Sequence, residues 1–376
     1  MSKSRSPWAK TVLKRIKPAL PSFRFLACIF LAAFCSVSYF ISFIHYGRNQ
    51  YIDPTLFIHT SANNTKNYFH VAVPTTEGVY SQWQSRVMYY HYKKAKEKPG
   101  SNMGKFTRIL HNGKSDSLMD EIPSFVVDPL PQEVHRGYWP LNRPWAYVKW
   151  LQSATIEEDY ILMGDPDHII VKPIPNFAYL GDPVAFPFAY MEPAKHGSVI
   201  RKYYPKEMGP VSNIDPIGSS PIIIKKSLME EIVPTWFNVS LRMKSDSVTE
   251  KEFGWVLEMY SYTVAAALHG VKHKFLKDFI VQPPYDEEVG RAFIIHYTYG
   301  CNYRIKTDIK NGQVREWSFD KRSYMRRPPP RDMPLPPPGV PKIVAMLVKL
   351  VNEASANTPN WDVDNDFFNR LFSWGK

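Results

Sequence analysis

The sequence predicts an α/β domain with a mostly parallel central sheet, preceded by one transmembrane helix. Three observations support this prediction. Strand-like and helix-like segments alternate over residues 69–173, which is typical of parallel strands joined by crossover helices. An apolar run of twenty residues precedes them near the N-terminus. The chain has 376 residues, 44% of them hydrophobic, which is enough to bury a substantial core.

The apolar run is FLACIFLAAFCSVSYFISFI, residues 25–44, and it carries no formal charge. A helix of this length crosses about 30 Å of hydrocarbon. Lys and Arg precede it, so the positive-inside rule predicts a cytosolic tail at residues 1–24. The run is longer than the core of a cleavable signal peptide, and it has no amphipathic face that would favour a buried core helix. We therefore expect a single-pass type II membrane protein with a polar stem at residues 45–67 and a lumenal domain.

The charge distribution argues against nucleic acid as a partner. The net charge is +12, but residues 1–50 carry eight of the 47 Lys and Arg residues and no Asp or Glu. The rest of the chain has 39 basic residues against 35 acidic ones, a net charge of only +4. A protein that binds the phosphate backbone is expected to carry its excess charge on the folded domain.

Cysteine usage and glycosylation sequons fit a lumenal enzyme. Cys28 and Cys35 fall within the predicted span, which leaves Cys301 as the only lumenal thiol. The lumenal domain can therefore form no internal disulfide and must depend on its core, unlike a small stapled recognition module. Asn63 and Asn238 each begin an N-glycosylation sequon.

The first half of the lumenal domain, which we expect to begin at residue 68, alternates strands and helices. In chain order we expect a strand at 69–73, a helix at 80–96, strands at 106–110 and 124–128, a helix from Asn142 and a strand within 160–173. Pro99-Gly100 should stop the first helix, and the second should have Asn142 as its N-cap and Pro144 in its first turn.

The second half is more mixed. We expect strands at 184–190, 219–226 and 291–300, a helix at 253–269 that stops at Gly270, and a short helix at 342–354. Residues 326–341, RRPPPRDMPLPPPGVP, should be polyproline II or an extended wrap because proline cannot complete a strand ladder. We place the end of the main domain at residue 325, and assign 326–376 to the wrap, the short helix and a tail.

Charged residues interrupt the most strand-like segment, YILMGDPDHIIVKP at 160–173. Open α/β sheets bind ligands beyond the carboxyl ends of their strands, so Asp165 and Asp167 are well placed for a site. Two carboxylates one residue apart can face a hard cation such as Mg²⁺ or Mn²⁺ together. In nucleotide-sugar glycosyltransferases such a metal bridges the diphosphate of the donor. The alternative is an Asp-Pro turn in which Asp165 bonds its own backbone.

A distant ligand is needed because two carboxylates leave coordination positions open. His296 lies in the strand-like run FIIHYTYG and is a candidate ligand for a metal such as Mn²⁺. The alternative is that it is a satisfied core histidine. His168, beside the two carboxylates, suits a supporting role in orienting them.

Other residues are candidates for holding a sugar nucleotide. Thr75 and Thr76 follow the first strand, where a loop can cradle a base or ribose. Arg86 and Arg143 suit a diphosphate, because guanidinium binds phosphate oxygens through paired donors, although each could equally be a solvated surface side chain.

Two acidic residues are the candidates for the chemistry at the sugar. Asp215 lies in the turn-rich segment NIDPIGSSP at 213–221, where it can bind sugar hydroxyls, and Gly218 of the same segment is a candidate for donor binding. Glu258 lies mid-helix among apolar residues, so it is either salt-bridged or functional. Either acid could orient the sugar or stabilise a cationic transition state.

Several segments together resemble one family. They include FHVAV, RGYWPLNRPWA, RKYYPKEMGPVSNIDPIGSSP, FGWVLEMYSY, FIIHYTYGC and FDKRSYMRRPPPRDMPLPPPGVP. From about residue 68 to about 362 the chain is similar to plant hydroxyproline O-arabinosyltransferases. The resemblance implies a Golgi type II enzyme with a GT-A-like fold that transfers L-arabinofuranose from UDP-L-arabinofuranose, using Mn²⁺ and retaining configuration. The implied acceptor is hydroxyproline in secreted peptides and extensin-like cell-wall proteins.

The family pattern usually has Glu at the position of Asp165, within a Glu-Pro-Asp-His element, so Asp167 is the safer metal ligand. The nearest alternative is a related enzyme that puts galactose from UDP-galactose on serine in the same wall proteins. A second is a non-catalytic Golgi adaptor, which we would expect to have lost its carboxylates. A hydroxyproline-rich acceptor forms a polyproline II ribbon, for which Trp139, Trp145, Tyr297 and Tyr299 are candidate aromatic docks.

Overall fold

A computed structural model describes residues 36, 50–57, 67–179, 181–306 and 314–362. The chain divides into two compact units, residues 1–49 and 50–376, and only Ser36 of the first is described. The predicted cytosolic tail, almost all of the predicted span at 25–44 and the sequon at Asn63 therefore lie outside the described residues. Among the residues that are described, no helix combines the length and apolar character needed to cross a membrane.

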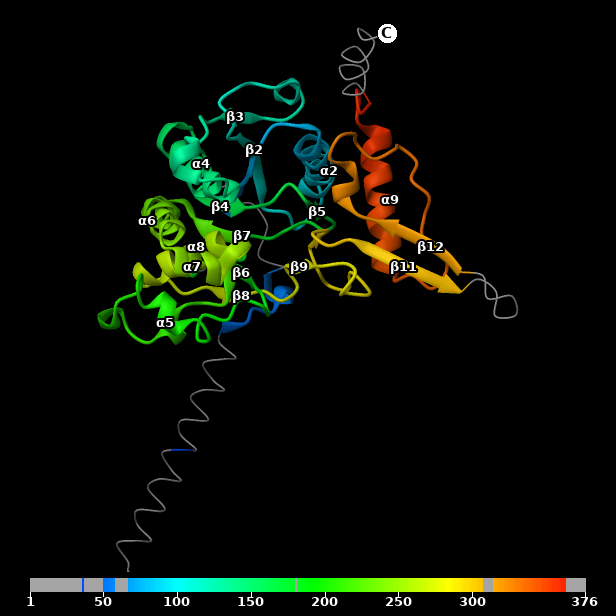
Figure 1. The fold of residues 1–376 in the computed structure, drawn as a ribbon. Helices are drawn as coiled ribbons and strands as arrows, with labels where there is room; N and C mark the ends of the chain where they lie inside the picture. The colour runs from blue at the N-terminus through cyan, green and yellow to red at the C-terminus, as the bar shows by residue number, and fades with distance from the viewer. Residues whose placement is uncertain (1–35, 37–49, 58–66, 180, 307–313, 363–376) are drawn as a thin grey trace, which may run out of the picture. The chain divides into compact units, whose positions relative to one another are not determined.

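The second unit is built around a seven-stranded sheet with the order β3-β2-β1-β4-β7-β6-β8 (Figure 1). Its strands are β1 (Phe69–Thr75), β2 (Met103–Leu110), β3 (Ser124–Val126), β4 (Tyr160–Met163), β6 (Val184–Pro187), β7 (Ile217–Lys225) and β8 (Lys274–Phe275). Four neighbouring pairs are parallel, and β7 runs antiparallel to both β4 and β6. The predicted α/β class and mostly parallel sheet are confirmed.

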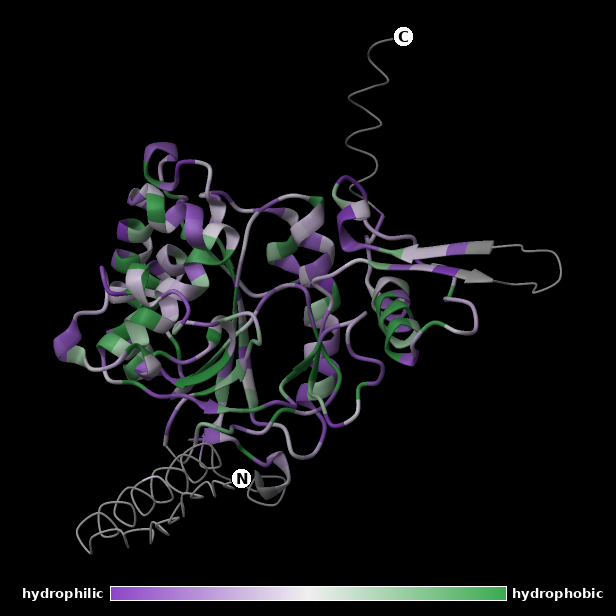
Figure 2. Cartoon of the chain, turned by 60° about the horizontal axis from the view of Figure 1, so that its bottom comes forward, coloured by the Kyte–Doolittle hydropathy of each residue, from purple (hydrophilic) through white to green (hydrophobic). Residues whose placement is uncertain are grey.

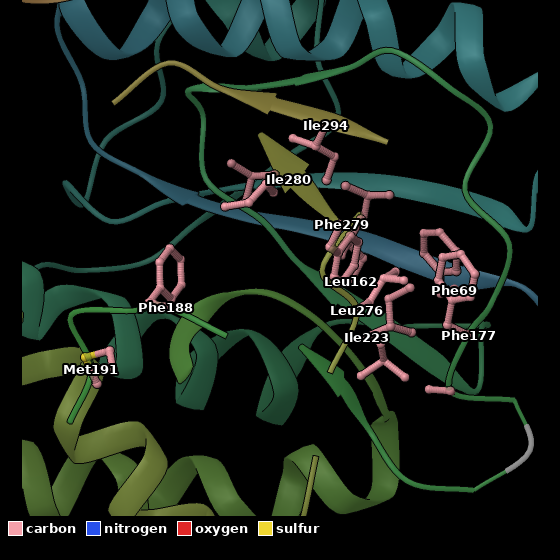
Figure 3. Close-up of a cluster of buried hydrophobic side chains, with 14 of the residues drawn as sticks. Phe69, Leu162, Phe177, Phe188, Met191, Ile223, Leu276, Phe279, Ile280 and Ile294 are labelled. Carbon is pink, nitrogen blue, oxygen red and sulfur yellow. The ribbon is translucent and has the colours of Figure 1, made fainter. Parts of the chain in front are cut away.

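Helices cover the sheet and bury alternate strand residues against themselves. The longer ones are α2 (Val79–Lys96), α4 (Asn142–Ser153), α6 (Lys226–Ser245), α7 (Ser247–Phe253), α8 (Leu257–Leu268) and α9 (Lys342–Asn357). Ile161 and Met163 of β4 pack in one cluster with α4, α6 and α8, whereas Leu162 packs in another with α2. Figure 3 shows Leu162 in the second cluster, with Phe69 and Ile223 of the neighbouring strands. Figure 2 shows hydrophobic residues along the sheet and mixed hydropathy along the helices, as this packing requires.

A small second sheet lies beside the first and has the order β5-β10-β9. Its strands are β5 (His168–Ile170), β9 (Ile280–Val281) and β10 (Ile294–His296). The segment 160–173 is therefore not one strand: β4 belongs to the large sheet, β5 belongs to the small one, and Gly164–Asp167 turn between them. The expected strand at 291–300 likewise shrinks to β10.

The C-terminal part adds a hairpin and a helix to the same unit. Strands β11 (Cys301–Lys306) and β12 (Val314–Phe319) are antiparallel and were not predicted. Residues 326–341 form neither helix nor strand, as expected, and lead into α9. This part packs on α2 and β5 through a core that includes Trp83, Ile169, Phe319, Leu347 and Trp361. Cys301 is buried with a free thiol.

Three local predictions need correction. Asn142 is the first residue of α4 and not its N-cap, because its side chain accepts from the Leu130 N–H and donates to the Trp139 carbonyl. The helix expected at 253–269 begins only at Leu257, after α7 and a 3₁₀ turn, η7 (Gly254–Val256), since Gly254 breaks the run with φ +49°. Helix α6 was missed because Pro234 lies inside it.

Candidate active site

The Asp165-Pro166-Asp167 turn leaves the carboxyl end of β4 and enters β5. Both strands are buried, so the turn is held at each end by rigid backbone. The Gly164 N–H donates to the Ala72 carbonyl of β1, and the His168 N–H donates to the Asp165 carbonyl, which closes the turn. The Asp165 carboxylate faces Arg143, with Oδ1 2.6 Å from Nη2.

Four side chains converge at this turn as a candidate metal centre. The ligand atoms of Asp165, Asp167, His168 and His296 all lie within 4.8 Å of one another. Strand pairing brings the distant member in, because β10 runs antiparallel to β5 with His296 opposite His168. The two imidazole rings meet edge to face, with centroids 4.7 Å apart. The fold thus joins the predicted pair of carboxylates to the predicted distant histidine.

The local electrostatics favour the ligand forms of these groups. Burial opposes ionisation of Asp167, but Lys321 and His296 outweigh it and hold the pKa of Asp167 well below its usual range. His296 Nε2 lies 3.3 Å from Asp167 Oδ2. Burial, helped by His296, lowers the pKa of His168 to about 4. Near neutral pH the carboxylate is therefore ionised and His168 is neutral, which are the states that a metal ion needs.

The fit of a divalent cation rests on the donor set itself. Two carboxylates and two imidazoles are ligands that suit Mn²⁺ and related ions. His168 Nε2 is buried and forms no hydrogen bond with any residue that the structure describes. Such an atom is costly to bury without a partner, and a ligand-binding role explains it.

Two cations flank the cluster, and the sequence predicted only one of them. Arg143, in the first turn of α4, also donates from Nη1 to Ser219 Oγ at 3.0 Å. Lys321, from the 3₁₀ turn η8 (Lys321–Tyr324), donates to Asp167 Oδ2. Burial would lower the pKa of Lys321, but the Asp167 carboxylate more than offsets it and keeps the ammonium charged. The sequence around Lys321 has no pattern that predicts a site, because its partner, Asp167, is 154 residues earlier in the chain.

Glu258 of α8 lies near Arg143 and is buried. Burial raises the pKa of Glu258 to about 7, and Arg143 only partly opposes this. Its Oε1 forms no hydrogen bond with a described residue. A buried carboxylate with an open acceptor atom and a pKa near 7 is characteristic of a functional group.

A cleft of about 670 Å³ is lined by all of these groups except His168, which is fully buried. Its charged and imidazole lining consists of Arg143, Asp165, Asp167, Glu258, His296 and Lys321. The other walls are largely aromatic and apolar, with Phe188, Tyr190, Trp255 and Tyr299 among them. The volume is in the range of small-molecule sites.

The structure does not bring every predicted residue to this lining. Thr75 and Thr76 lie at the end of β1 and in the loop after it, with the Thr75 hydroxyl donating to the Thr76 carbonyl. Arg86 forms a bidentate pair with Glu121, at 2.8 and 2.6 Å. Its guanidinium therefore has a carboxylate partner of its own.

Asp215 and Gly218 lie behind the cleft. The Asp215 carboxylate accepts from the backbone N–H of His273 at 2.8 Å and lies 3.0 Å from its ring Nδ1. Gly218 of β7 lets Met259 and Phe188 approach its backbone, since a side chain there would collide with both. The neighbouring Ser219 and Ser220 do line the cleft and were missed as individual residues.

Two family profiles match the chain over most of its length. The N-terminal domain of the hydroxyproline O-arabinosyltransferase family matches residues 69–275, and the C-terminal domain of the same family matches residues 293–362. The chain belongs to the hydroxyproline O-arabinosyltransferase family. All four residues of the metal cluster and both flanking cations lie within the matched regions.

Members of the family are similar to the chain over nearly all of their own length. A hydroxyproline O-arabinosyltransferase of Lotus japonicus is 62% identical over 80% of this chain and 83% of the relative. One of Medicago truncatula is 54% identical over 90% of this chain and 97% of the relative.

A peptidyl serine alpha-galactosyltransferase of Arabidopsis thaliana is 24% identical over 68% of this chain and 31% of that protein.

Solved structures resemble the chain only loosely. A galactosyltransferase in complex with donor and acceptor sugar analogues matches with a TM-score of 0.36 and 12% identity. The match covers 61% of this chain and 87% of that one.

Proposed function

We propose that the chain is a hydroxyproline O-arabinosyltransferase that transfers L-arabinofuranose from UDP-L-arabinofuranose to hydroxyproline in secreted peptides and extensin-like proteins, with retention of configuration. The observation that carries the proposal is the metal cluster of Asp165, Asp167, His168 and His296, set between two cations at the base of one cleft. Family membership supplies the identity of sugar and acceptor, and the cluster supplies a place for the diphosphate. We propose that the main domain has a GT-A-like fold.

We assign the divalent cation, Mn²⁺ in the first instance, to Asp165, Asp167 and His296, with His168 completing the donor set. When bound, the ion neutralises the charge that develops on the diphosphate as UDP leaves. Asp167 is the central ligand because it is buried and already contacts His296. The family pattern usually has Glu at position 165, and Asp165 provides the same carboxylate on a shorter side chain.

Arg143 and Lys321 hold the diphosphate from the two sides of the cluster. Both side chains line the cleft, and each contacts one of the metal-binding carboxylates. Guanidinium and ammonium groups bind phosphate oxygens and remain charged under all physiological conditions. Their placement favours departure of UDP from the anomeric carbon.

Glu258 acts at the sugar. Its free Oε1 is available to a sugar hydroxyl, and its negative form stabilises positive charge at the anomeric carbon. The bond from that carbon to the phosphate oxygen breaks, and a bond to the hydroxyproline oxygen forms as its hydroxyl proton is lost.

We place the enzyme in the Golgi membrane as a single-pass type II protein with its catalytic domain in the lumen. The support is the apolar run at 25–44 with basic residues before it. Expression of the full chain with a protease-accessible tag at each end tests this topology. Protection of the C-terminal tag and digestion of the N-terminal tag in intact Golgi vesicles are expected, and the reverse pattern refutes it.

The activity is tested with the purified full-length chain, UDP-L-arabinofuranose or UDP-galactose, and matched hydroxyproline and serine peptides. Arabinose transfer to the hydroxyproline peptide is expected, and it should stop when EDTA removes the metal and return with Mn²⁺. Galactose transfer to serine as the main reaction would replace the proposal with the galactosyltransferase alternative. Absence of any turnover, with Mn²⁺ present, would support a non-catalytic adaptor.

A further inference from the structure

We infer that the uncharged, aromatic part of the cleft lining is the groove that binds the acceptor. Trp255, Tyr190 and Tyr299 of this groove bind an uncharged polyproline II peptide. This inference rests on the proposed function, since it assigns the acceptor of the same reaction to a surface. Transfer requires the peptide to lie against the base of the cleft, and these aromatic walls are continuous with that base.

The groove has two walls from different parts of the fold. One is formed by Tyr190, after β6, together with Trp255 and Val256 of η7 and Met259 of α8. The other is formed by Thr298 and Tyr299, which follow β10. The metal cluster lies where β5 meets β10, and Thr298 and Tyr299 directly follow β10, so a peptide bound along these residues lies next to the cluster.

Trp255 is the most exposed tryptophan side chain of the described residues, with 76% of its surface accessible. It packs only edge to face against Tyr138, at 6.2 Å between ring centroids. Its backbone is nevertheless held, because the Tyr138 hydroxyl donates to the Trp255 carbonyl at 2.7 Å. A large indole fixed in position and left in water is typical of a binding anchor.

Tyr299, after β10, also lines the cleft and is half-buried. Its ring meets Tyr285 edge to face at 4.9 Å, and Tyr285 is itself 75% exposed. The pair extends the aromatic surface outward from the cleft. A polyproline II helix repeats every three residues with a rise of about 3.1 Å per residue, so a long peptide can contact both the cleft and this extension.

The molecule already binds a proline-rich segment of its own by the same means. Trp361 and Trp317 donate their indole N–H groups to the carbonyls of Pro329 and Pro334. Such carbonyls are free to accept because a polyproline II helix forms no internal hydrogen bonds. The Trp255 indole N–H makes no such bond within the part of the chain that the structure describes, and it is therefore available to an acceptor peptide.

The absence of charge on the groove residues also favours an uncharged polyproline II peptide. Tyr190, Trp255, Val256, Met259 and Tyr299 are all uncharged members of the cleft lining. Apolar pyrrolidine rings can stack on these walls without desolvating an ion. The internal segment 326–341 is already held by Trp361, Trp317 and Asn352, so a separate peptide is the occupant.

The test measures peptide binding and turnover separately, with the full-length chain. Binding of a fluorescent hydroxyproline-proline peptide is followed by anisotropy with UDP and Mn²⁺ present, and a glycine-serine peptide of equal length serves as comparison. Trp255→Ala should weaken binding about tenfold or more, and Tyr299→Ala should weaken it as well. The matched control is Trp139→Ala: this indole is 62% exposed but stacks on His135 outside the lining of the cleft.

Kinetics give the second readout. Trp255→Ala should raise the KM for the peptide about tenfold and change the KM for UDP-arabinofuranose much less. Unchanged peptide affinity in Trp255→Ala and Tyr299→Ala, or an equal loss in Trp139→Ala, overturns the groove even if arabinose transfer is intact. Conversely, loss of peptide binding in Trp255→Ala and Tyr299→Ala, with binding intact in Trp139→Ala, upholds the groove even if the transferred sugar proves not to be arabinose.

Discussion

Asp167 contacts two side chains from parts of the chain that lie far from it in sequence, the imidazole of His296 in β10 and the ammonium group of Lys321 in η8. Its burial would by itself favour the neutral acid, and only these contacts keep it ionised. The residue therefore depends on the complete fold for its chemical state. Asp165 has a more open position and a single described cation beside it, Arg143.

Asp167→Asn should lower arabinose transfer at least about a hundredfold and abolish stimulation by Mn²⁺, because the amide removes the central anionic ligand. Turnover over a Mn²⁺ titration, together with Mn²⁺ binding measured by electron paramagnetic resonance, checks this. Asp332→Asn is the matched control, since Asp332 is exposed in the proline-rich segment. Mn²⁺ binding of wild-type affinity in Asp167→Asn would contradict the assigned ligand.

Asp165→Glu should retain activity within about threefold, because the longer side chain keeps the charge that the metal and Arg143 require. Asp165→Ala should lose activity about as severely as Asp167→Asn. The measurement is kcat/KM for the UDP-sugar in both variants. Equal loss in the glutamate and alanine variants would show that chain length at this position matters more than charge.

Glu258→Gln should lower kcat and remove a rise in rate that is centred near pH 7 in the parent enzyme. The pKa of Glu258 is raised from 4.5 to about 7 by burial, so the active carboxylate forms only through that range. The unfolded chain ionises near pH 4.5, so folding stability falls as pH rises from 4.5 to about 7. The glutamine variant should therefore gain Tm relative to the parent at pH 8 but not at pH 4. A parallel Tm difference at both pH values would contradict the assignment.

The pairing of short strands does most to assemble the site. Strand β5 has only three residues, yet its antiparallel register with β10 places His168 opposite His296. The C-terminal part has a comparable role, since η8 supplies Lys321 and is supported by the core around α9. Short elements near the C-terminus thus complete the cleft and the candidate metal centre.

Trp361→Ala should reduce the free energy of unfolding by about 3–5 kcal/mol, the usual range for removing a fully buried tryptophan. The indole is completely enclosed and donates to the Pro329 carbonyl, which ties the proline-rich segment to α9. Denaturant unfolding by circular dichroism measures the change. Leu335→Ala, at an exposed position of the same segment, should change stability by less than about 0.5 kcal/mol. A similar effect of both substitutions would mean that the segment is not anchored through Trp361.

The end of the large sheet at which β1 begins holds a buried hydrogen-bonded pair that influences the stability of the whole unit. His70 Nδ1 of β1 lies 2.9 Å from Glu158 Oε2, and His70 Nε2 lies 2.7 Å from the Thr107 hydroxyl of β2. The pair joins two strands to the loop before β4. Burial opposes ionisation of Glu158, but hydrogen bonds from His70 and Lys105 outweigh it and lower its pKa to about 2.

Glu158→Gln should destabilise the protein at pH 7 and have a progressively smaller effect as the pH falls from about 4.5 to 2. A carboxylate whose folded pKa is depressed contributes stability above its unfolded pKa of 4.5 and loses it as pH falls through the folded value. Urea unfolding at several pH values provides the measurement. Glu157→Gln is the control, because that neighbouring side chain is exposed. A difference between Glu158→Gln and the parent that stays constant down to pH 2 would contradict the prediction.

Local sequence patterns were sufficient to predict many of the helices and strands. Strands β1 and β2 and helices α2 and α9 were predicted closely because their apolar periodicity and their stop signals agree. Helix α6 was missed because Pro234 disfavours helix locally, while burial of Trp236 and its neighbours stabilises the helix. Hairpin β11–β12 was missed although β11, CNYRIK, alternates apolar and polar residues, because β12, VREWSF, breaks that alternation.

The sequence by itself determined the α/β class, the carboxylates at the end of a strand and His296 as their distant partner. These follow from residue types and local spacing, which a linear pattern records. Only the tertiary structure decided that Lys321 joins the cluster, that Arg86 and Asp215 have partners elsewhere, and that Trp255 faces the cleft. The physical reason is that burial and pairing of charges depend on which distant segments meet, and that is settled by the packing of the two sheets and the C-terminal core.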